Sequence, residues 1–482
     1  MASISSIGVG SNLDLGALLT QLQTAENQPL VALKAKQTSY NSKLSAYGTL
    51  QSALAGIQAA AKKLGDPALF QAITGTPSVS GIMAATGTDP RSAGSYAIDI
   101  SQLAQAQSVI AKGQANTTTA IGSGKITIDF GKVSGGTLDP VTGQYTGATF
   151  DKDTTRTAKP ITIDATNNTL GGIRDAINAA NAGVSATIVN DGSGTPNRLV
   201  LTSTKTGETS AMRISVDGDA ALQGLLNNDP AGTQNLQQTA AAQNAKLTVN
   251  GIAVTSTTNS VTDAIQGTTL TLVQTGKLNL VMKANTASVK TAITDFVKAY
   301  NALQSTAKSL TAFDAEAETA APLVGDSTLR NLQTRIRQAL TSPQPGGAND
   351  LKVLTSIGIS FQKDGTLAVD NDKLDKAIDT NLEGVSKLFA SGTGSTAGYG
   401  KQLSALVDNL TSTGGALKVA SDGMTASLKQ LDEQYADMKT RVDAKVERYR
   451  AQFTQLDLLM SQMNSTSNYL TQQFASMQNS SK

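Results

Sequence analysis

The chain of 482 residues contains no cysteine, histidine or tryptophan, and only 4% of it is aromatic. Without cysteine and histidine there are no disulfides, thiolate nucleophiles, zinc–thiolate sites, imidazole bases or imidazole metal ligands. Charged residues make up 16% of the chain, against about 25% in an average globular protein. The formal net charge is +2. That small charge argues against nucleic acid or an anionic membrane as a partner, because both attract a strongly basic surface.

The N-terminal stretch lacks the positively charged start and the continuous apolar run of a cleaved signal peptide. No stretch approaches the ~20 predominantly apolar residues that a membrane-spanning helix needs. We therefore expect no membrane insertion, and we expect any export to use a route without a cleaved signal. The length corresponds to about three domains, at roughly 150 residues each.

Both ends of the chain show helical periodicity. From Leu13 to Leu64, apolar residues recur mostly every three or four positions, which predicts a helix capped by Asn12 or Asp14, with a kink or restart at Pro29. From Met424 onward the steps alternate between four and three with one stutter, as in a coiled coil. A seam of that length needs a helical partner, and the N-terminal helix is the one of comparable length. The predicted seam residues are Leu428, Leu431, Tyr435, Met438, Val442, Val446, Tyr449, Phe453 and Leu456.

The two ends are also uncharged. No charged side chain precedes Asp14, and none occurs from Leu458 to Ser481. A regular apolar stripe without charges favours a helix buried on most sides in an assembly, since buried charges are costly to desolvate; the alternative is a frayed tail. We expect both ends to be unfolded alone and ordered in a complex. The candidate interface residues are Ile4, Ile7, Leu13, Leu15, Leu18, Leu22, Met460, Met463, Leu470, Phe474 and Met477.

The middle of the chain, 74–286, alternates apolar and polar residues between Gly, Asn and Asp turns, as β-strands do. The dipeptide Asn250-Gly251 predicts a tight hairpin. A second hairpin is expected over Thr275-Gly276, between strands at 268–273 and 278–282. Short helices are predicted at 170–182 and 261–265.

Helical patterns return at residue 287, with predicted helices over 288–311, 329–340 and 374–389 and a β-hairpin near 357–369. We predict an α+β multidomain fold, in which an antiparallel helical, coiled-coil stalk from both termini carries inserted β-rich head domains. The predicted parts are a terminal coiled-coil leg (1–42 and 424–482), a helical stalk domain (43–73 and 287–423), a β-rich head domain (74–112 and 243–286) and an outer, variable β-rich head domain (113–242).

Motifs for catalysis are weak. The pattern S-x-x-K occurs at 305–308 and 360–363, but its partner K-T-G, at 205–207, precedes both, and no S-D-N lies between them. The glycine-rich segment 122–125 lacks the first glycine and the final Ser/Thr of a phosphate loop. We predict no catalytic, cofactor-binding or metal-binding residues, and therefore no enzyme.

Several segments resemble the bacterial flagellar filament cap family, also called hook-associated protein 2. Their combination is specific, although each piece alone is not. Residues from about 113 to 242 match nothing specific, as expected of an exposed variable head. The matching segments are 3–15 (SISSIGVGSNLDL), 18–19 (LL), 26–30 (ENQPL), 43–48 (KLSAYG), 94–107 (GSYAIDISQLAQAQ), 296–301 (FVKAYN), 354–361 (LTSIGISF), 364–367 (DGTL) and 449–463 (YRAQFTQLDLLMSQM).

The resemblance implies an extracellular, non-enzymatic assembly factor at the flagellum tip. Members form a homo-oligomeric ring that retains exported flagellin and promotes its folding, while the legs detach and rebind. The implied partners are flagellin, the junction hook-associated protein at the hook–filament boundary, further copies of the chain and an export chaperone; the implied route is the flagellar type III apparatus. Two alternatives stay open: another axial protein, such as a junction protein or flagellin, and a secreted adhesin whose head binds host mucin or a cell surface.

Overall fold

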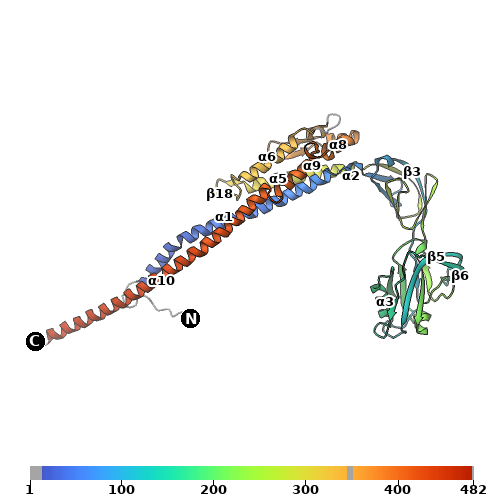
Figure 1. The fold of residues 1–482 in the computed structure, drawn as a ribbon, viewed down its shortest axis with the longest axis horizontal. Helices are drawn as coiled ribbons and strands as arrows, with labels where there is room; N and C mark the ends of the chain where they lie inside the picture. The colour runs from blue at the N-terminus through green and yellow to red at the C-terminus, as the bar shows by residue number, and fades with distance from the viewer. Residues whose placement is uncertain (1–13, 345–350, 480–482) are drawn as a thin grey trace. The chain divides into compact units, whose positions relative to one another are not determined.

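The computed structural model describes residues 14–344 and 351–479. By its contacts the chain divides into two compact units: unit 1 combines Met1–Leu69 with Thr286–Lys482, and unit 2 is Phe70–Asn285. Unit 1 is mainly helical and unit 2 is rich in β-strands (Figure 1). The predicted fold class, α+β multidomain with β-rich domains inserted between two long terminal helices, is confirmed. The finer domain boundaries stay predictions.

The two terminal helices, α1 (Leu15–Leu64) and α10 (Ala416–Asn479), are the longest elements of unit 1. The side chain of Asp14 caps α1 by accepting a hydrogen bond from the Ala17 amide at 2.9 Å, as predicted. The predicted kink or restart at Pro29 is wrong, because α1 continues through it. Pro29 lies on the exposed side of the helix, where water can satisfy the carbonyl of Ala25 that loses its donor.

The two long helices pack antiparallel. Glu26 of α1 pairs with Lys445 of α10, and Gln37, further along α1, bonds to Asp432, earlier in α10. Figure 1 shows the two helices side by side, with α10 continuing past the start of α1. The long C-terminal helix therefore has the partner that the sequence predicts.

The rest of unit 1 packs around the C-terminal half of α1. The rings of Phe296 and Tyr399 both contact Phe389 edge-on, at centroid distances of 6.3 and 6.4 Å, and all three are buried. The hairpin of β19 (Ile359–Phe361) and β20 (Leu367–Val369) confirms the hairpin predicted near 357–369. The elements are α2 (Pro67–Gln71, which runs on into unit 2), α5 (Thr286–Leu310), β17 (Phe313–Asp314), β18 (Thr319–Ala320), α6 (Ser327–Thr341), η3 (Leu354–Ile357), β19 (Ile359–Phe361), β20 (Leu367–Val369), α7 (Asn371–Thr380), α8 (Leu382–Ala390), η4 (Gly394–Thr396) and α9 (Tyr399–Thr411).

Unit 2 contains one eight-stranded antiparallel sheet with its own apolar core. Its strand order is β13-β12-β3-β16-β1-β2-β15-β14. The predicted hairpin at Asn250-Gly251 is confirmed, since it joins β12 to β13. The strands are β1 (Ile73–Pro77), β2 (Met83–Gly87), β3 (Gly94–Gln102), β12 (Ala245–Val249), β13 (Ile252–Ser256), β14 (Ser260–Thr262), β15 (Thr268–Leu272) and β16 (Gly276–Ala284), and a short helix η1 (Pro90–Ser92) precedes β3.

Two predictions in this sheet are wrong. β15 and β16 do not form a hairpin over Thr275-Gly276, because the β1–β2 pair lies between them in the sheet. The amides of Val273 and Gln274 instead bond to the carbonyl of Ile82. The helix predicted at 261–265 is absent as well: Val261 belongs to β14 and is buried opposite Leu270.

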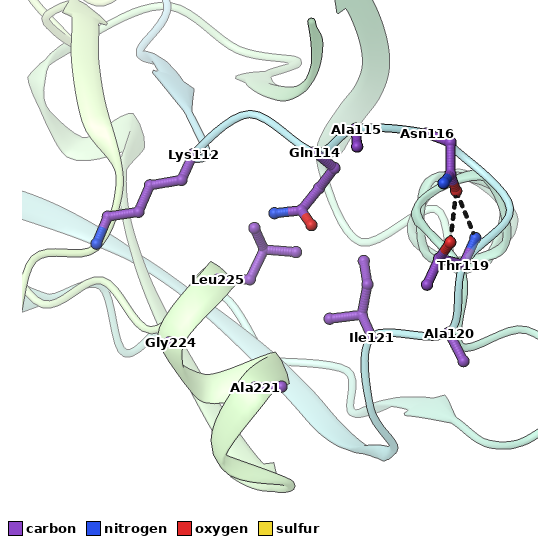
Figure 2. A pocket seen from close by; sticks show the side chains of 10 residues that line it. All are labelled: Lys112, Gln114, Ala115, Asn116, Thr119, Ala120, Ile121, Ala221, Gly224 and Leu225. Atoms are coloured by element: carbon purple, nitrogen blue, oxygen red, sulfur yellow. Dashed lines mark hydrogen bonds between the residues drawn. The ribbon is translucent and has the colours of Figure 1, made fainter. Parts of the chain in front are cut away.

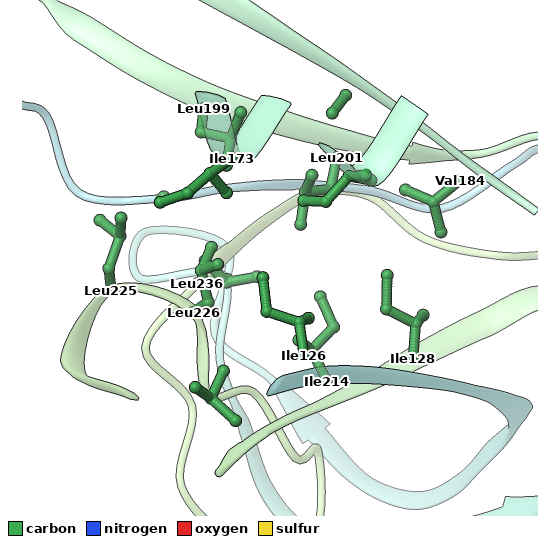
Figure 3. Packing of buried hydrophobic residues seen from close by; sticks show 14 of the residues in the cluster. Ile126, Ile128, Ile173, Val184, Leu199, Leu201, Ile214, Leu225, Leu226 and Leu236 are labelled. Carbon is green, nitrogen blue, oxygen red and sulfur yellow. The ribbon is translucent and has the colours of Figure 1, made fainter. Parts of the chain in front are cut away.

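A second core of unit 2 lies between two smaller sheets, with orders β10-β5-β6 and β11-β4-β9-β8. Figure 3 shows Leu199 and Leu201 of β9 facing Ile126 and Ile214 of β5 and β10. The helix predicted at 170–182 is confirmed as α3. The elements are β4 (Ser108–Ile110), β5 (Gly124–Leu138), β6 (Tyr145–Lys152), β7 (Ile161–Ile163), α3 (Leu170–Ala179), β8 (Val184–Asn190), β9 (Asn197–Ser203), η2 (Glu208–Ser210), β10 (Ala211–Gly218), α4 (Ala220–Leu226) and β11 (Gln237–Ala240).

One buried carboxylate ties three strands of this core together. Asp129 of β5 lies 2.7 Å from the Lys152 ammonium of β6 and 2.8 Å from the Arg213 guanidinium of β10. Burial raises the pKa of Asp129, but the two cations outweigh it and hold that pKa below its usual value. The carboxylate therefore stays charged and links the edges of one sheet.

Candidate assembly interface

The seam between α1 and α10 has a thin apolar core, as the sequence pattern indicates. In the described residues, four side chains form its buried cluster: Leu19 and Leu30 of α1 with Val442 and Val446 of α10. Half-buried side chains pack at its margin, namely Tyr435, Met438, Tyr449 and Phe453. This core is much smaller than that of the body of unit 1. The leg, which we define as 15–38 of α1 with 432–457 of α10, is therefore the weakly held part of the unit.

Polar contacts set the register of the leg. The Gln37 side chain is buried and donates to a carboxylate oxygen of Asp432 at 2.7 Å. Glu26 lies 2.6 Å from Lys445 and accepts a hydrogen bond from the Tyr449 hydroxyl at 3.3 Å. The hydrogen bond from Lys445 holds the pKa of Glu26 below its usual value. These contacts occur at fixed levels of the two helices, so a sliding of one helix past the other would break them.

The predicted seam residues differ in their burial. Leu431, Val442 and Val446 are buried, whereas Leu456 is 42% exposed. The others are half-buried: Leu428, Tyr435, Met438, Tyr449 and Phe453. The burial of the seam residues thus decreases toward the end of the seam, near the level at which α1 begins.

The predicted interface residues fall into three groups. Ile4, Ile7 and Leu13 lie outside the described residues. In α1, Leu15 is buried, Leu22 is half-buried and Leu18 is exposed. In α10, Met460 is half-buried and four side chains are between 48% and 65% exposed: Met463, Leu470, Phe474 and Met477.

These four exposed side chains lie on the terminal segment of α10, which we define as 458–479. They recur at intervals of seven, four and three residues, and therefore follow one side of the helix. The segment carries no charged residue. An exposed apolar stripe of this kind is typical of a surface that binds another protein.

One feature of the leg is not apparent from the sequence pattern. A groove of about 640 Å³ runs along the helix pair, between residues that include Leu30, Val31 and Lys34 of α1 and Tyr435 and Lys439 of α10. Val31 is 62% exposed on its rim. Val31 lies beside the predicted stripe rather than on it, so helical periodicity alone did not single it out.

Unit 2 has a hollow of about 380 Å³, shown in Figure 2. Lys112 is the one charged residue among those that line it, and the side-chain oxygen of Asn116 is bonded to the Thr119 backbone and hydroxyl. Such a lining offers no pair of groups for acid–base chemistry.

The weak catalytic motifs are not brought together. The serines at 305 and 360 belong to unit 1, whereas the K-T-G triplet at 205–207 belongs to unit 2. Among the described residues, no group of three or more Asp and Glu side chains could hold a metal ion. Over 14–344 and 351–479, no helix has the length and apolar character needed to cross a bilayer.

The fold defines an α+β multidomain protein whose two ends pair as long antiparallel helices. Family models of flagellar hook-associated protein 2 match at both ends, the N-terminal model over 11–107 and the C-terminal model over 242–465. A flagellin hook IN motif matches 146–205, so the expectation that residues 113–242 match nothing specific is wrong.

The chain is similar to proteins named flagellar hook-associated protein 2. It is 40% identical to that of Escherichia coli K12 and 37% identical to that of Salmonella typhimurium, in each case over 494 aligned positions that cover all of both chains. The crystal structure of the flagellar cap protein FliD D1-D2-D3 domains from Escherichia coli matches with a TM-score of 0.60 and 36% identity, covering 78% of this chain and 99% of that one. The chain belongs to the flagellar hook-associated protein 2 family, the flagellar cap proteins.

Proposed function

We propose that this protein caps the flagellar filament, as an oligomeric plate at the distal tip that retains exported flagellin and promotes its folding and insertion. Family membership supports the cap over the junction protein, flagellin and adhesin alternatives. The observation that carries the proposal is the terminal segment of α10, with its exposed, uncharged apolar stripe.

The stripe suits a contact that must hold and yet release. Burying one large apolar side chain contributes about 1.5–3 kcal/mol, and ordering the segment opposes part of that gain. A single leg therefore binds reversibly. Several legs in one ring bind together far more tightly, because each release leaves the others in place. In this proposal the legs detach and rebind one at a time as the filament grows.

The proposal includes the partners and the route. The partners are flagellin, further copies of this chain, the junction hook-associated protein, and an export chaperone before secretion. The chain leaves the cell through the flagellar type III apparatus without a cleaved signal peptide. An uncharged terminal segment without cysteine is compatible with export as an unfolded chain.

The test is a triple variant, Leu470→Asp with Phe474→Asp and Met477→Asp, supplied to a strain that lacks the chromosomal copy. We expect flagellin to be lost into the medium and filaments to be absent or short, because each buried carboxylate opposes docking. Flagellin in the medium and filament length by electron microscopy are the two measurements. Normal filaments with this variant would refute the proposal.

The chain offers a matched control on the other side of the same helix. Ser465→Asp with Asn468→Asp and Gln472→Asp adds the same charge about half a turn away from the stripe, at exposed positions. We expect this variant to retain flagellin. Circular dichroism of both purified variants checks that they keep the same helix and strand content as the unmodified chain.

A further inference from the structure

A short acidic hairpin projects from unit 1. Strands β17 and β18 form it, and every residue from Phe313 to Ala320 is exposed, with Phe313 at 62%. Its base is fixed, because the amides of Ala321 and Leu323 donate to the carbonyls of residues 312 and 310 at 2.8 and 2.9 Å. The segment FDAEAETA contains three carboxylates and no cation, a charge of −3.

The turn of this hairpin is ordered from within. The Asp314 carboxylate accepts hydrogen bonds from the amides of Glu316 and Ala317 at 3.0 and 3.1 Å. The side-chain carboxylates of Glu316 and Glu318, by contrast, form no ion pair with any cation of residues 14–344 or 351–479. The hairpin is thus an ordered, projecting element with an exposed aromatic ring and two carboxylates that form no ion pair in the described chain.

The next element, α6, has the opposite charge. It contains Arg330, Arg335 and Arg337 and no acidic residue, a charge of +3. The three arginines are exposed, and they flank a polar strip that includes Asn331 and Thr334. Asp326, which caps the helix, already accepts hydrogen bonds from the Tyr47 hydroxyl and the Leu329 amide.

The arginines of α6 make no ion pair with any residue of 14–344 or 351–479. Arg330 reaches the Gly325 carbonyl at 3.4 Å, which leaves its charge uncompensated. Unit 1 therefore carries a cationic helix face and an acidic hairpin of equal and opposite charge, and neither forms an ion pair within the described residues.

We propose that the exposed face of α6 is a docking surface for the 313–320 hairpin of a second copy of this chain. The charges are complementary, −3 against +3, and every copy carries both halves of the contact. Arginine also stacks on aromatic rings, so the guanidinium groups of α6 can receive Phe313 as well as the carboxylates. A contact between two different patches is the kind that joins successive copies in a ring.

The first test measures self-association of the full chain by sedimentation and mass photometry. Arg330→Glu with Arg335→Glu makes the face of α6 negative, like the hairpin that it would bind. Glu316→Arg with Glu318→Arg makes the hairpin positive, like the face of α6. We expect each double variant to associate at least about tenfold more weakly, since close interfacial charge pairs couple strongly. Combining all four substitutions restores opposite charges, and we expect association to return. At 1 M salt the unmodified chain is expected to associate more weakly too, because the Debye length is then about 3 Å.

A matched control moves the same charge elsewhere. Lys36→Glu with Lys429→Glu alters two exposed lysines of the long helices, outside both patches, and is expected to associate like the unmodified chain. A monomeric unmodified chain, unchanged association in both double variants, or a four-fold variant that stays dissociated would each overturn the inference. A control that dissociates as strongly as the α6 variant would overturn it as well.

The second test locates the contact. Because the chain has no cysteine, Glu316→Cys in one preparation and Asn331→Cys in another each introduce a single thiol. Oxidation of the mixture is expected to yield a disulfide-linked pair well above the yield of either preparation alone, and equal yields would contradict the contact. The inference rests on the proposed cap assembly, but the tests separate the two. Association through this contact without capping would refute the proposed function alone, and capping with unchanged association would refute the contact alone.

Discussion

The thin core of the leg allows its stability to be perturbed apart from the rest of unit 1. Val442 and Val446 are two of the four side chains that form its buried apolar cluster. Truncating both to alanine removes about two CH₂ equivalents each, worth roughly 0.8 kcal/mol apiece, so about 3 kcal/mol in all. The body of unit 1 has its own buried aromatic cluster around Phe296 and should not respond.

Hydrogen exchange followed by mass spectrometry measures this effect. Since a tenfold change corresponds to about 1.4 kcal/mol, local opening of the leg should become roughly 100-fold more frequent in Val442→Ala with Val446→Ala. We expect faster exchange in peptides from 15–38 and 432–457, and unchanged exchange in α5. Val419→Ala is the matched control, because this valine lies on the same helix but is 57% exposed. Unchanged exchange in the leg, or an equal increase in α5, would refute the idea that a small separate core holds the leg.

Three further predictions concern single positions. Tyr47→Phe removes a 2.6 Å hydrogen bond to Asp326 and should lower the free energy of unfolding by about 1–3 kcal/mol. Burial, and then Asp326, raise the pKa of Tyr47 to about 12 from 10.0, so the stabilisation from its protonated hydroxyl is complete below pH 10 and is lost as the pH rises toward 12. A denaturation series in alkaline buffers would detect this loss. Asp129→Asn should destabilise unit 2 by about 1–3 kcal/mol, because it leaves two cations without their buried carboxylate; an unchanged melting temperature would contradict this. Gly251→Ala should lower the free energy of unfolding by about 1 kcal/mol, because of the positive φ of 82° alone. Gly75→Ala should lower it more, because the added Cβ would lie 2.6 Å from the Ala85 Cβ. Calorimetry of both variants measures which one is less stable.

The sequence by itself predicted the elements whose cause is local. The period of the C-terminal stripe predicted a helix that the structure extends over Ala416–Asn479. The helix cap at Asp14 and the hairpin turn at Asn250-Gly251 each depend on contacts between residues that are close in sequence, so the local sequence predicts both. The absence of charged side chains from 458 to 481 likewise indicated an interface in the terminal segment from the sequence alone.

The pairing of distant strands was decided by the tertiary structure. The false hairpin at Thr275-Gly276 shows the reason: a turn dipeptide says nothing about whether another pair of strands lies between its flanks. The role of the Asp129 carboxylate depends on a cation, Arg213, that lies far from it in sequence. The position of Val31 on a groove depends on the packing of two helices. Most of all, α6 and the hairpin at 313–320 are ordinary charged segments in the sequence. Only folding shows that neither charge is compensated within the described chain, since compensation depends on which side chains come within a few ångströms of each other.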